Sequence, residues 1–442
     1  MKKIKLTALE RSWILYDIGN SAFILLVSTL IPIYFNALAT TGGLNESLYL
    51  SYWGYAGSVS TLLVAVIGPI CGTLADHRGF KKPIFMACML LGVLGCAAMG
   101  VTAGWLAFLI VFVLAKVGYS SSLVFYDAML PEVTTDERMD TVSSMGYAYG
   151  YIGSVIPFIL CLLLVLFGGK IGVGTGTAMV VSFLITAGWW FVCTQPLLKR
   201  YRQTAFVEHG GNPVSSTFRR LRDTFREVRQ QKHIFLYLLA FFFFIDGVYT
   251  IIDMATAYGT ALGLDTTGLL LALLLTQFVA FPCSIAFGRF SAKYDTGLLI
   301  KICILCYTGI TLFAVFLVSQ WQFWVLAVLV GMFQGGIQAL SRSMFGKMIP
   351  DKKRTGEFFG FYDIFGKFSA IMGPALVGLT SALAADVMLK NAGETRATAS
   401  EALLAQVNVD AAPWGILSVL IIFFIGGGLY FFVLPKYRKK KG

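Results

Sequence analysis

Twelve long apolar segments, spread along the whole chain, constrain its fold more than any other feature of the sequence. Each segment is long enough to cross the hydrocarbon layer of a membrane, which is ~30 Å thick and takes about 20 helical residues. Lipid offers no partner for backbone N–H and C=O groups, and the segments are too long and too uniformly apolar to be strands of a barrel. We therefore expect an all-α membrane protein with twelve transmembrane helices. The predicted spans are residues 12–38, 51–75, 83–103, 105–130, 143–168, 174–197, 233–260, 267–290, 298–319, 322–347, 358–383 and 413–435.

The composition excludes a water-soluble globule, because 57% of the 442 residues are hydrophobic and only 13% are charged. The net charge of +12 is the difference between 35 Lys and Arg residues and 23 Asp and Glu residues. Most of the basic residues fall near the two ends of the chain and in alternate loops, which is the pattern of cytoplasmic loops. Lys170, Lys390 and Arg396 fall on the predicted outer side. We predict a multi-pass protein of a bacterial inner membrane, with both termini in the cytoplasm and no nucleic-acid partner.

A basic polar stretch at residues 198–232 divides the spans equally. We predict an N-terminal six-helix bundle (residues 1–197), a cytoplasmic connector (198–232) and a C-terminal six-helix bundle (233–442). Apolar residues recur in the connector at helical spacing with arginines around them, as in a helix that lies on an anionic membrane surface. These apolar residues are Phe218, Leu221, Phe225 and Val228. The connector is either a tether on the membrane or a regulatory, partner-binding segment.

The two predicted bundles resemble each other. The fourth and tenth spans end in M129-L-P-E132 and M348-I-P-D351, and a span rich in glycine and aromatic residues follows each of them. Pro157 and Pro374 lie in those following spans. Carriers of this size are commonly two related bundles that move around a central site. The glycines and prolines suit a moving bundle, although ordinary helix packing explains them as well.

The loop G72-T-L-A-D-H-R-G-F-K-K82 resembles the signature loop of the major facilitator superfamily. Its glycines allow helix ends to approach closely, and Asp76 can accept hydrogen bonds from the N-terminus of a neighbouring helix. Such a loop gates transport and does not bind the substrate, so we assign Asp76 and Arg78 to gating. The counterpart in the second half is degraded, with Ala292 at the position of the acid.

A closer resemblance rests on several blocks across the chain, among them W13-I-L-Y-D-I-G-N-S-A-F23, F125-Y-D-A-M-L-P-E132, D246-G-V-Y-T250 and G335-G-I-Q-A-L-S-R-S343. These blocks are similar to those of the vacuolar amino-acid effluxer branch of the superfamily, which includes yeast autophagy-related permeases. The resemblance implies export of neutral amino acids, linked to a proton gradient. This chain has Asp127 where the family favours Asn, and Asp253 is an added acid.

Two aspartates within predicted spans are the first candidates for a functional site, because an acid inside a bilayer usually faces a cavity or a partner. Asp246 lies about 20 Å beyond His233 along its helix, near mid-membrane, and Lys116 reaches a similar depth from the other side. The two could form an ion pair, or each could bind one charge of a zwitterion. Asp17 lies nearer the inner surface. Further polar candidates in the spans are Asn20, Asp253, Gln277, Gln334 and Gln338, although each Gln could simply join helices by hydrogen bonds.

Proton coupling would have to use carboxylates, because no His lies in the interior of a span. Asp246, Asp17 and Asp253 are the candidates, and a structural role is the main alternative for Asp17. A second group of charged residues lies near the predicted inner ends of the spans, where we expect a gate. This group adds Asp127, Arg342, Asp363 and Lys367 to Asp76 and Arg78.

No set of residues in the sequence suggests an enzyme, a metal site or a cofactor. Cys303 and Cys306 form a C-x-x-C pattern without companions of a metal site, and no ATP-binding motif is visible. We therefore expect a monomeric secondary transporter whose partners are a small organic solute, protons or another coupling ion, and the lipid bilayer. The alternatives are a lipid or lipophilic-drug exporter of the same fold and, from another class, a non-transporting receptor.

Overall fold

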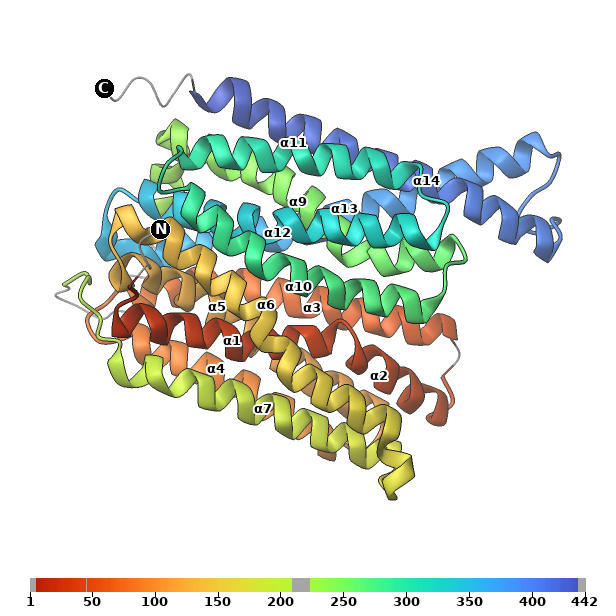
Figure 1. The fold of residues 1–442 in the computed structure, drawn as a ribbon, viewed down its shortest axis with the longest axis horizontal. Helices are drawn as coiled ribbons and strands as arrows, with labels where there is room; N and C mark the ends of the chain where they lie inside the picture. Colours follow the sequence, from red (N-terminus) through yellow and green to blue (C-terminus); the bar gives the residue numbers. More distant parts are fainter. Residues whose placement is uncertain (1–4, 45, 209–222, 436–442) are drawn as a thin grey trace. The chain divides into compact units, whose positions relative to one another are not determined.

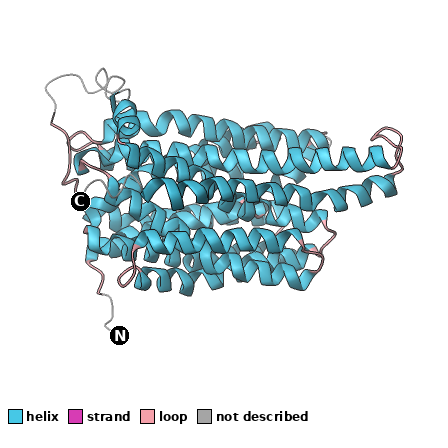
Figure 2. Ribbon diagram, turned by 90° about the horizontal axis from the view of Figure 1, so that it is seen from above, coloured by secondary structure: helices cyan, strands magenta, loops and turns pink. Residues whose placement is uncertain are grey.

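The structure, a computed structural model, describes residues 5–44, 46–208 and 223–435. Within these ranges the chain is helical, with no strand beyond a single bridge between His77 and Val207 (Figure 2). The long helices are α1 Ala8–Val27, α2 Leu30–Thr41, α3 Glu46–Ala75, α4 Lys81–Ala98, α5 Trp105–Val133, α6 Asp136–Phe167, α7 Thr175–Arg200, α9 Lys232–Ala261, α10 Thr266–Phe290, α11 Thr296–Val315, α12 Gln320–Met348, α13 Thr355–Asn391 and α14 Glu401–Gly428. A π-helical turn, η4 Leu429–Val433, continues α14.

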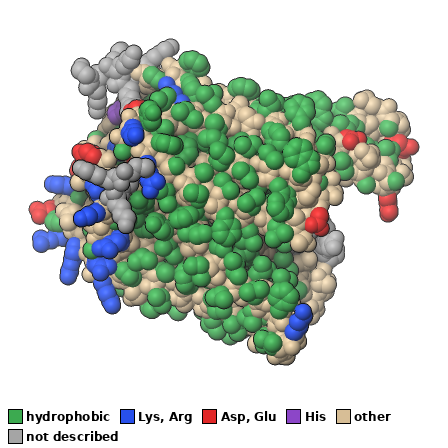
Figure 3. Space-filling view, in the orientation of Figure 1, with side chains coloured by type: hydrophobic (Ala, Val, Ile, Leu, Met, Phe, Trp, Pro, Cys, Tyr) green, Lys and Arg blue, Asp and Glu red, His purple; other side chains and the backbone are tan. Residues whose placement is uncertain are grey.

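Twelve spans long and apolar enough to cross a membrane occur in the described residues, which confirms the predicted number. In Figure 3, hydrophobic side chains cover most of the face that is shown, whereas most of the visible Lys and Arg lie at its left-hand side. Several apolar side chains are strongly exposed. Leu94, Leu166 and Phe424 are each more than 60% exposed. Apolar surface of this extent is stable when it faces lipid.

The first span is not the single helix that the sequence predicted. It consists of α1 and α2, with a break at Ser28 and Thr29 (Figure 1). Thr29 has φ −130° and ψ −77°, outside the helical region. Its hydroxyl donates to the carbonyl oxygen of Leu25 at 2.6 Å, and the Ser28 hydroxyl donates to the same carbonyl at 3.1 Å. Hydroxyls that bond to the backbone in this way offer an alternative to the helical ladder, which accounts for the break.

The chain packs as two compact units. Unit 1 comprises residues 1–225 and 345–364, and unit 2 comprises residues 226–344 and 365–442. In unit 1, α1 packs on α6 and α7, and α4 packs on α5. In unit 2, α14 packs on both α9 and α11. The end of α12 and the start of α13 thus pack with the N-terminal helices, and α13 continues from unit 1 into unit 2.

The last two spans are longer than predicted. We expected them to cover residues 358–383 and 413–435, but α13 continues to Asn391 and α14 begins at Glu401. The two extensions form a hairpin that projects past the ends of α10 and α11 (Figure 1). An apolar cluster of Ala385, Leu389, Val407 and Ala411 joins the extensions. Because these residues are small or isolated among polar ones, hydropathy alone did not identify the extensions as helices.

Candidate functional site

Asp76 holds the start of α13. It follows the last residue of α3, its side chain is fully buried, and its two carboxylate oxygens accept hydrogen bonds from the amides of Gly356 and Glu357, both at 2.8 Å. We call Asp76 and these two amides the Asp76 clamp. At the clamp, α3 and α13 lie so close together that residue 72 must be glycine. A Cβ at this position would meet the carbonyl oxygen of Gly356. Amides in the first turn of a helix lack helical partners, so a carboxylate there satisfies them.

Burial and the neighbouring groups have opposite effects on the pKa of Asp76. Burial raises the pKa of Asp76 from 3.8 to about 6, although the Lys81 ammonium, 3.6 Å away, and the two amides favour the charged form. The Glu357 carboxylate adds a small effect that raises the pKa of Asp76 further. Asp76 is therefore ionised at neutral pH, but it gains a proton more readily than a solvated aspartate does.

Lys81 and Glu132 form a buried ion pair beside the clamp. The Lys81 ammonium lies 2.7 Å from Glu132 Oε1 and donates to Thr355 Oγ1 at 2.8 Å. Glu132 also accepts from the Tyr201 hydroxyl at 3.0 Å. Burial and the Glu132 carboxylate raise the pKa of Tyr201, which keeps its hydroxyl protonated as a donor. The ion pair thus joins α4, α5, the end of α7 and the start of α13.

The connector contacts this network at both of its described ends. At its start, the amides of Thr204 and Ala205 donate to Glu132 Oε2 at 2.7 and 3.1 Å, and the Val207 amide donates to the carbonyl oxygen of Asp76 at 2.8 Å. After the undescribed segment, the Thr224 hydroxyl donates to Glu357. Of the predicted amphipathic positions, Phe218 and Leu221 lie outside the described residues, and residues 223–230 are helical.

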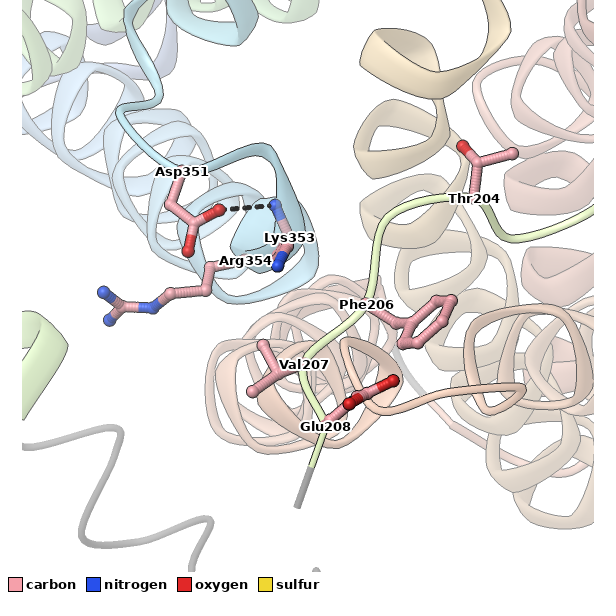
Figure 4. Close-up of a pocket in the computed structure, with 7 residues that line it drawn as sticks. All are labelled: Thr204, Phe206, Val207, Glu208, Asp351, Lys353 and Arg354. Atoms are coloured by element: carbon pink, nitrogen blue, oxygen red, sulfur yellow. Dashed lines mark hydrogen bonds between the residues drawn. The ribbon is translucent and has the colours of Figure 1, made fainter.

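A cavity of about 550 Å³ opens where the start of the connector faces the segment before α13. Figure 4 shows its lining, which combines charged and apolar side chains from these two segments. The lining residues are Thr204, Phe206, Val207, Glu208, Asp351, Lys353 and Arg354. Asp351 accepts from the Lys353 amide at 2.9 Å, and the Arg78 guanidinium lies 5.3 Å from the centre of the Phe206 ring.

The predicted gating residues come from both units of the structure. Asp76, Arg78, Asp127 and Asp363 belong to unit 1, whereas Arg342 and Lys367 belong to unit 2. Within unit 1, a Cβ on Gly68 would lie 3.9 Å from Asp363 Oδ2, so this acid lies against α3. Arg342 is buried in α12, with 3% of its surface exposed. Sequence reasoning did not assign Lys81 or Glu132 to the gate, although both lie in motifs that it quoted.

Asp17 is buried among three helices of unit 1. Its Oδ2 accepts from the Tyr126 hydroxyl at 3.0 Å, and Asn20 Nδ2 lies 3.5 Å from Oδ1. The Trp13 ring stacks on Tyr126, with centroids 4.2 Å apart, and the Trp13 indole donates to the Tyr126 carbonyl oxygen at 2.9 Å. A Cβ on Gly146 of α6 would lie 2.8 Å from Asp17 Oδ2. Asp17 is therefore closely enclosed by side chains of unit 1.

Asp246 has a different environment in unit 2. It is fully buried in α9, and its Oδ1 accepts from the Gly373 amide at 2.8 Å and from the Thr250 hydroxyl at 3.4 Å. Its Oδ2 is buried and has no hydrogen-bond partner among the described residues. A Cβ on Gly373 would meet Thr250 Oγ1, so α9 and α13 approach closely only because residue 373 is glycine. We call this arrangement the Asp246 contact.

The remaining candidates have more varied environments. Lys116, in unit 1, is partly buried, lies 3.9 Å from the Cβ position of Gly57, and has its ammonium 5.9 Å from the centre of the Phe112 ring. In unit 2, Gln334 is buried, Asp253 is exposed, and Gln277 and Gln338 are intermediate. Because Lys116 and Asp246 belong to different units, the predicted ion pair between them stays a prediction.

Comparison with known families identifies one family model, described as vacuole effluxer Atg22 like, which matches residues 8–139 and 132–386. The uncharacterised MFS-type transporter YxiO of Bacillus subtilis is 41% identical over 384 residues, which cover 86% of this chain and 90% of YxiO. Autophagy-related protein 22-1 of Penicillium rubens is 29% identical over 269 residues, which cover 54% of this chain and only 44% of the fungal protein.

Solved structures of major facilitator transporters share the fold. The human organic anion transporter MFSD10 aligns with a TM-score of 0.65 and 13% identity, covering 96% of this chain and 98% of MFSD10. The transporter FucP in its outward conformation aligns with a TM-score of 0.64 and 12% identity, covering 95% of this chain and 97% of FucP. At these identities the likeness concerns the fold alone.

Proposed function

Because the chain belongs to the Atg22-like vacuole effluxer family and is a major facilitator transporter rather than an enzyme, we propose that it exports neutral amino acids in exchange for protons. The observation that carries this proposal is the environment of the Asp246 carboxyl group. Its carboxyl group is buried in a membrane span and has one oxygen paired and one oxygen without a hydrogen-bond partner among the described residues. A carboxyl group in this setting is suited to binding and releasing a proton during transport.

The family and the charges inside the spans support the proposed substrate class. A neutral amino acid is a zwitterion, and a buried zwitterion needs a partner for each charge. Lys116 could bind its carboxylate, and Asp17 or Asp246 could bind its ammonium group. Amide and carboxylate side chains would complete the site by hydrogen bonds. These are Asn20, Asp253, Gln277, Gln334 and Gln338.

We propose that the Asp76 clamp acts as the cytoplasmic gate of the transporter. Its two short hydrogen bonds and the adjacent ion pair of Lys81 and Glu132 hold the start of α13 against α3 and α4. Opening this gate would expose these charges to water, which would compensate for the lost contacts. Arg78, Asp127, Arg342, Asp363 and Lys367 would assist the gate from neighbouring positions.

We propose the arrangement in the membrane from the distribution of the basic residues. The basic residues near the clamp would face the cytoplasm, together with both termini, and the long hairpin of α13 and α14 would face outside. The protein would work as a monomer of two six-helix bundles, residues 1–197 and 233–442, joined by the connector 198–232. A bacterial inner membrane fits the likeness to the Bacillus subtilis protein.

Export of lipids or lipophilic drugs is the alternative that the phenylalanines of α9 suggest. Phe241 and Phe244 are buried, and Phe244 packs against Tyr430 with ring centroids 5.9 Å apart. Both side chains are therefore used in packing within unit 2. This use does not favour a lipid path along α9, so we retain the amino-acid proposal.

Counterflow in proteoliposomes tests the proposed function. Vesicles preloaded with unlabelled neutral amino acids should take up the labelled mixture above the level of empty vesicles, and an imposed pH gradient should increase the accumulation. Asp246→Asn should abolish the response to the gradient but retain counterflow at equal pH. Asp410→Asn, at an exposed position of α14 to which no role is assigned, is the control. Absence of counterflow in correctly folded protein would reject amino acids as substrates, and a gradient response that survives Asp246→Asn would reject Asp246 as the proton carrier.

A further inference from the structure

The Asp246 contact lies at the one proline inside α13. Pro374 has no amide hydrogen, so the carbonyl of Ala370 lacks its usual helical partner. The residue before it, Gly373, donates its amide to Asp246 on another helix. The proline thus removes one bond of the helical pattern, and the amide just before it binds a side chain of another helix. Proline positions of this kind are where helices bend.

A second carboxylate holds α13 near its start. The Asp76 clamp binds the amides of Gly356 and Glu357 in unit 1, and the Asp246 contact binds the amide of Gly373 in unit 2. Both acids are fully buried, and both accept hydrogen bonds from backbone amides of α13. Helix α13 is therefore one continuous element that an acid of each unit holds by its amides.

The strength of the Asp246 contact depends on the charge of the carboxyl group. A hydrogen bond from an amide to a carboxylate is about twice as strong as one to a neutral group. If Asp246 binds a proton, Oδ2 carries it, because Oδ1 is already used by Gly373 and Thr250. The neutral group then accepts the Gly373 amide less strongly, and α13 has more freedom to bend at Pro374.

The groups that contact the Asp246 carboxyl group are uncharged. The groups shown to act on Asp246 are the Gly373 amide and the Thr250 hydroxyl, both uncharged. The charged and titratable side chains of unit 2 on α9 and on the helices around it are Lys232, His233, Tyr237, Tyr249, Asp253, Tyr258, Arg289, Lys301, Tyr307, Arg342, Lys367, Asp386, Lys390, Glu401, Asp410 and Tyr430, with Cys283, Cys303 and Cys306. Between residues 411 and 428, α14 has no charged side chain.

We propose that Asp246 is a positioning residue for α13: binding of a proton to Oδ2 weakens its hold on the Gly373 amide and allows α13 to bend at Gly373 and Pro374. This inference rests on the proposed proton coupling and names what the proton changes. Because α13 begins in the Asp76 clamp, the bend would transmit the protonation of Asp246 to the gate. The proton would thereby control a helix and need not contact the solute.

Hydrogen–deuterium exchange of the full-length protein in nanodiscs tests this directly. The readout is the protection of the α13 amides between residues 366 and 380, corrected for the intrinsic effect of pH on exchange. Lowering the pH from 8 to 5.5 should reduce protection in the wild type by about tenfold, the change expected when a charge-assisted hydrogen bond becomes a neutral one. Asp246→Asn should show low protection at both pH values. Asp410→Asn, at an exposed position of α14, should follow the wild type.

Two controls separate the contact from general loosening. Around Pro157 in α6, where no acid holds the preceding amides in the described hydrogen bonds, the same pH change should leave protection unchanged. Gly373→Ala should loosen α13 because its methyl group would meet Thr250 Oγ1, whereas Gly378→Ala, with no atom within 4 Å of its Cβ position, should not. A wild type whose α13 protection is independent of pH would overturn the proposal, and this outcome does not require any variant to fold.

A failure of this inference can be distinguished from a failure of the proposed function. If amino-acid counterflow fails while α13 responds to pH through Asp246, the substrate is wrong and the role of Asp246 stands. If counterflow is present but Asp246→Asn leaves the pH response of α13 unchanged, the role of Asp246 in bending is wrong and amino-acid transport stands.

Discussion

Three of the buried aspartates, Asp17, Asp76 and Asp246, differ in what satisfies their oxygens. Asp17 accepts from a tyrosine hydroxyl, Asp76 accepts from two amides and lies near an ammonium group, and Asp246 accepts from one amide and one hydroxyl through the same oxygen. Side-chain donors such as Tyr126 fix an acid in place within its own unit. Backbone donors link the acid to the position of a whole helix, so Asp76 and Asp246 are better suited to conformational control than Asp17 is.

Asp76 should make the gate sensitive to pH. Its pKa is about 6 in the clamp and 3.8 when solvated, so the clamp binds a proton more tightly than the open arrangement does. The stabilisation that this proton gives to the clamp is full below about pH 4 and is lost as the pH rises through about 6. Spin labels at the exposed positions Phe80 and Lys353 should report a larger closed fraction at pH 5 than at pH 7.

The variant Asp76→Asn is the control for this prediction, because it keeps an acceptor oxygen but cannot titrate. Its label distances should not change between pH 5 and pH 7. A closed fraction that rises with pH in the wild type would contradict the sign, and an identical pH response in the variant would assign the effect to another group.

At the scale of elements, close helix contacts through glycine decide where α13 is held. Gly72 lets α3 approach the start of α13, and Gly373 lets α9 approach α13 next to Pro374. Glycine in the middle of a helix costs about 0.5–1 kcal/mol relative to alanine, so these positions give up some local helix stability for the contacts they allow.

Gly72→Ala and Gly54→Ala should therefore have opposite effects on the same helix. The methyl group at residue 72 would meet the Gly356 carbonyl oxygen and should destabilise the protein by about 1–3 kcal/mol, as overpacking typically does. At residue 54, no atom lies within 4 Å of the Cβ position, so alanine should be neutral or stabilising. Thermal unfolding in detergent measures both, and equal shifts for the two variants would refute the close contact.

The start of the connector should be released by loss of Glu132. Glu132→Ala removes the acceptor of the Thr204 and Ala205 amides and leaves the buried Lys81 without its closest acid. Tryptic cleavage after the exposed Arg202 should become about tenfold faster, the change expected for a loss of ~1.4 kcal/mol of local stability. Glu137→Ala, at an exposed position on α6, should leave the cleavage rate unchanged; equal rates in both variants would show that Glu132 does not hold the connector.

At the scale of the molecule, the sequence predicted the fold well because a lipid environment leaves few choices. Long apolar segments must be helices, and the family resemblance, which the family model and the Bacillus subtilis relative confirm, placed them in the major facilitator fold. The break at Thr29 and the extensions of α13 and α14 were not predicted. The break depends on a hydrogen bond between a hydroxyl and the backbone, and the extensions pack through a cluster that includes small residues. Hydropathy reflects neither of these features.

The candidate site was predicted less completely than the fold. The acids were found because charge in an apolar segment is conspicuous, as with Asp17 and Asp246. Lys81 and Glu132 were not selected, because they lie at the ends of spans where charge is ordinary, and only the tertiary structure shows that they are buried together. The roles assigned to the candidate residues stay predictions until the variants described above are measured.

The assignment of residues 345–364 to unit 1 has a consequence for biosynthesis. A ribosome makes the chain from its N-terminus, so α1 to α7 enter the membrane long before the residues that bind Asp76 and Lys81 have been synthesised. During that interval these charged side chains lack their partners from α13 and depend on water, lipid headgroups or insertion factors. The first unit of the protein therefore becomes complete only near the end of translation, after most of the second unit has been made.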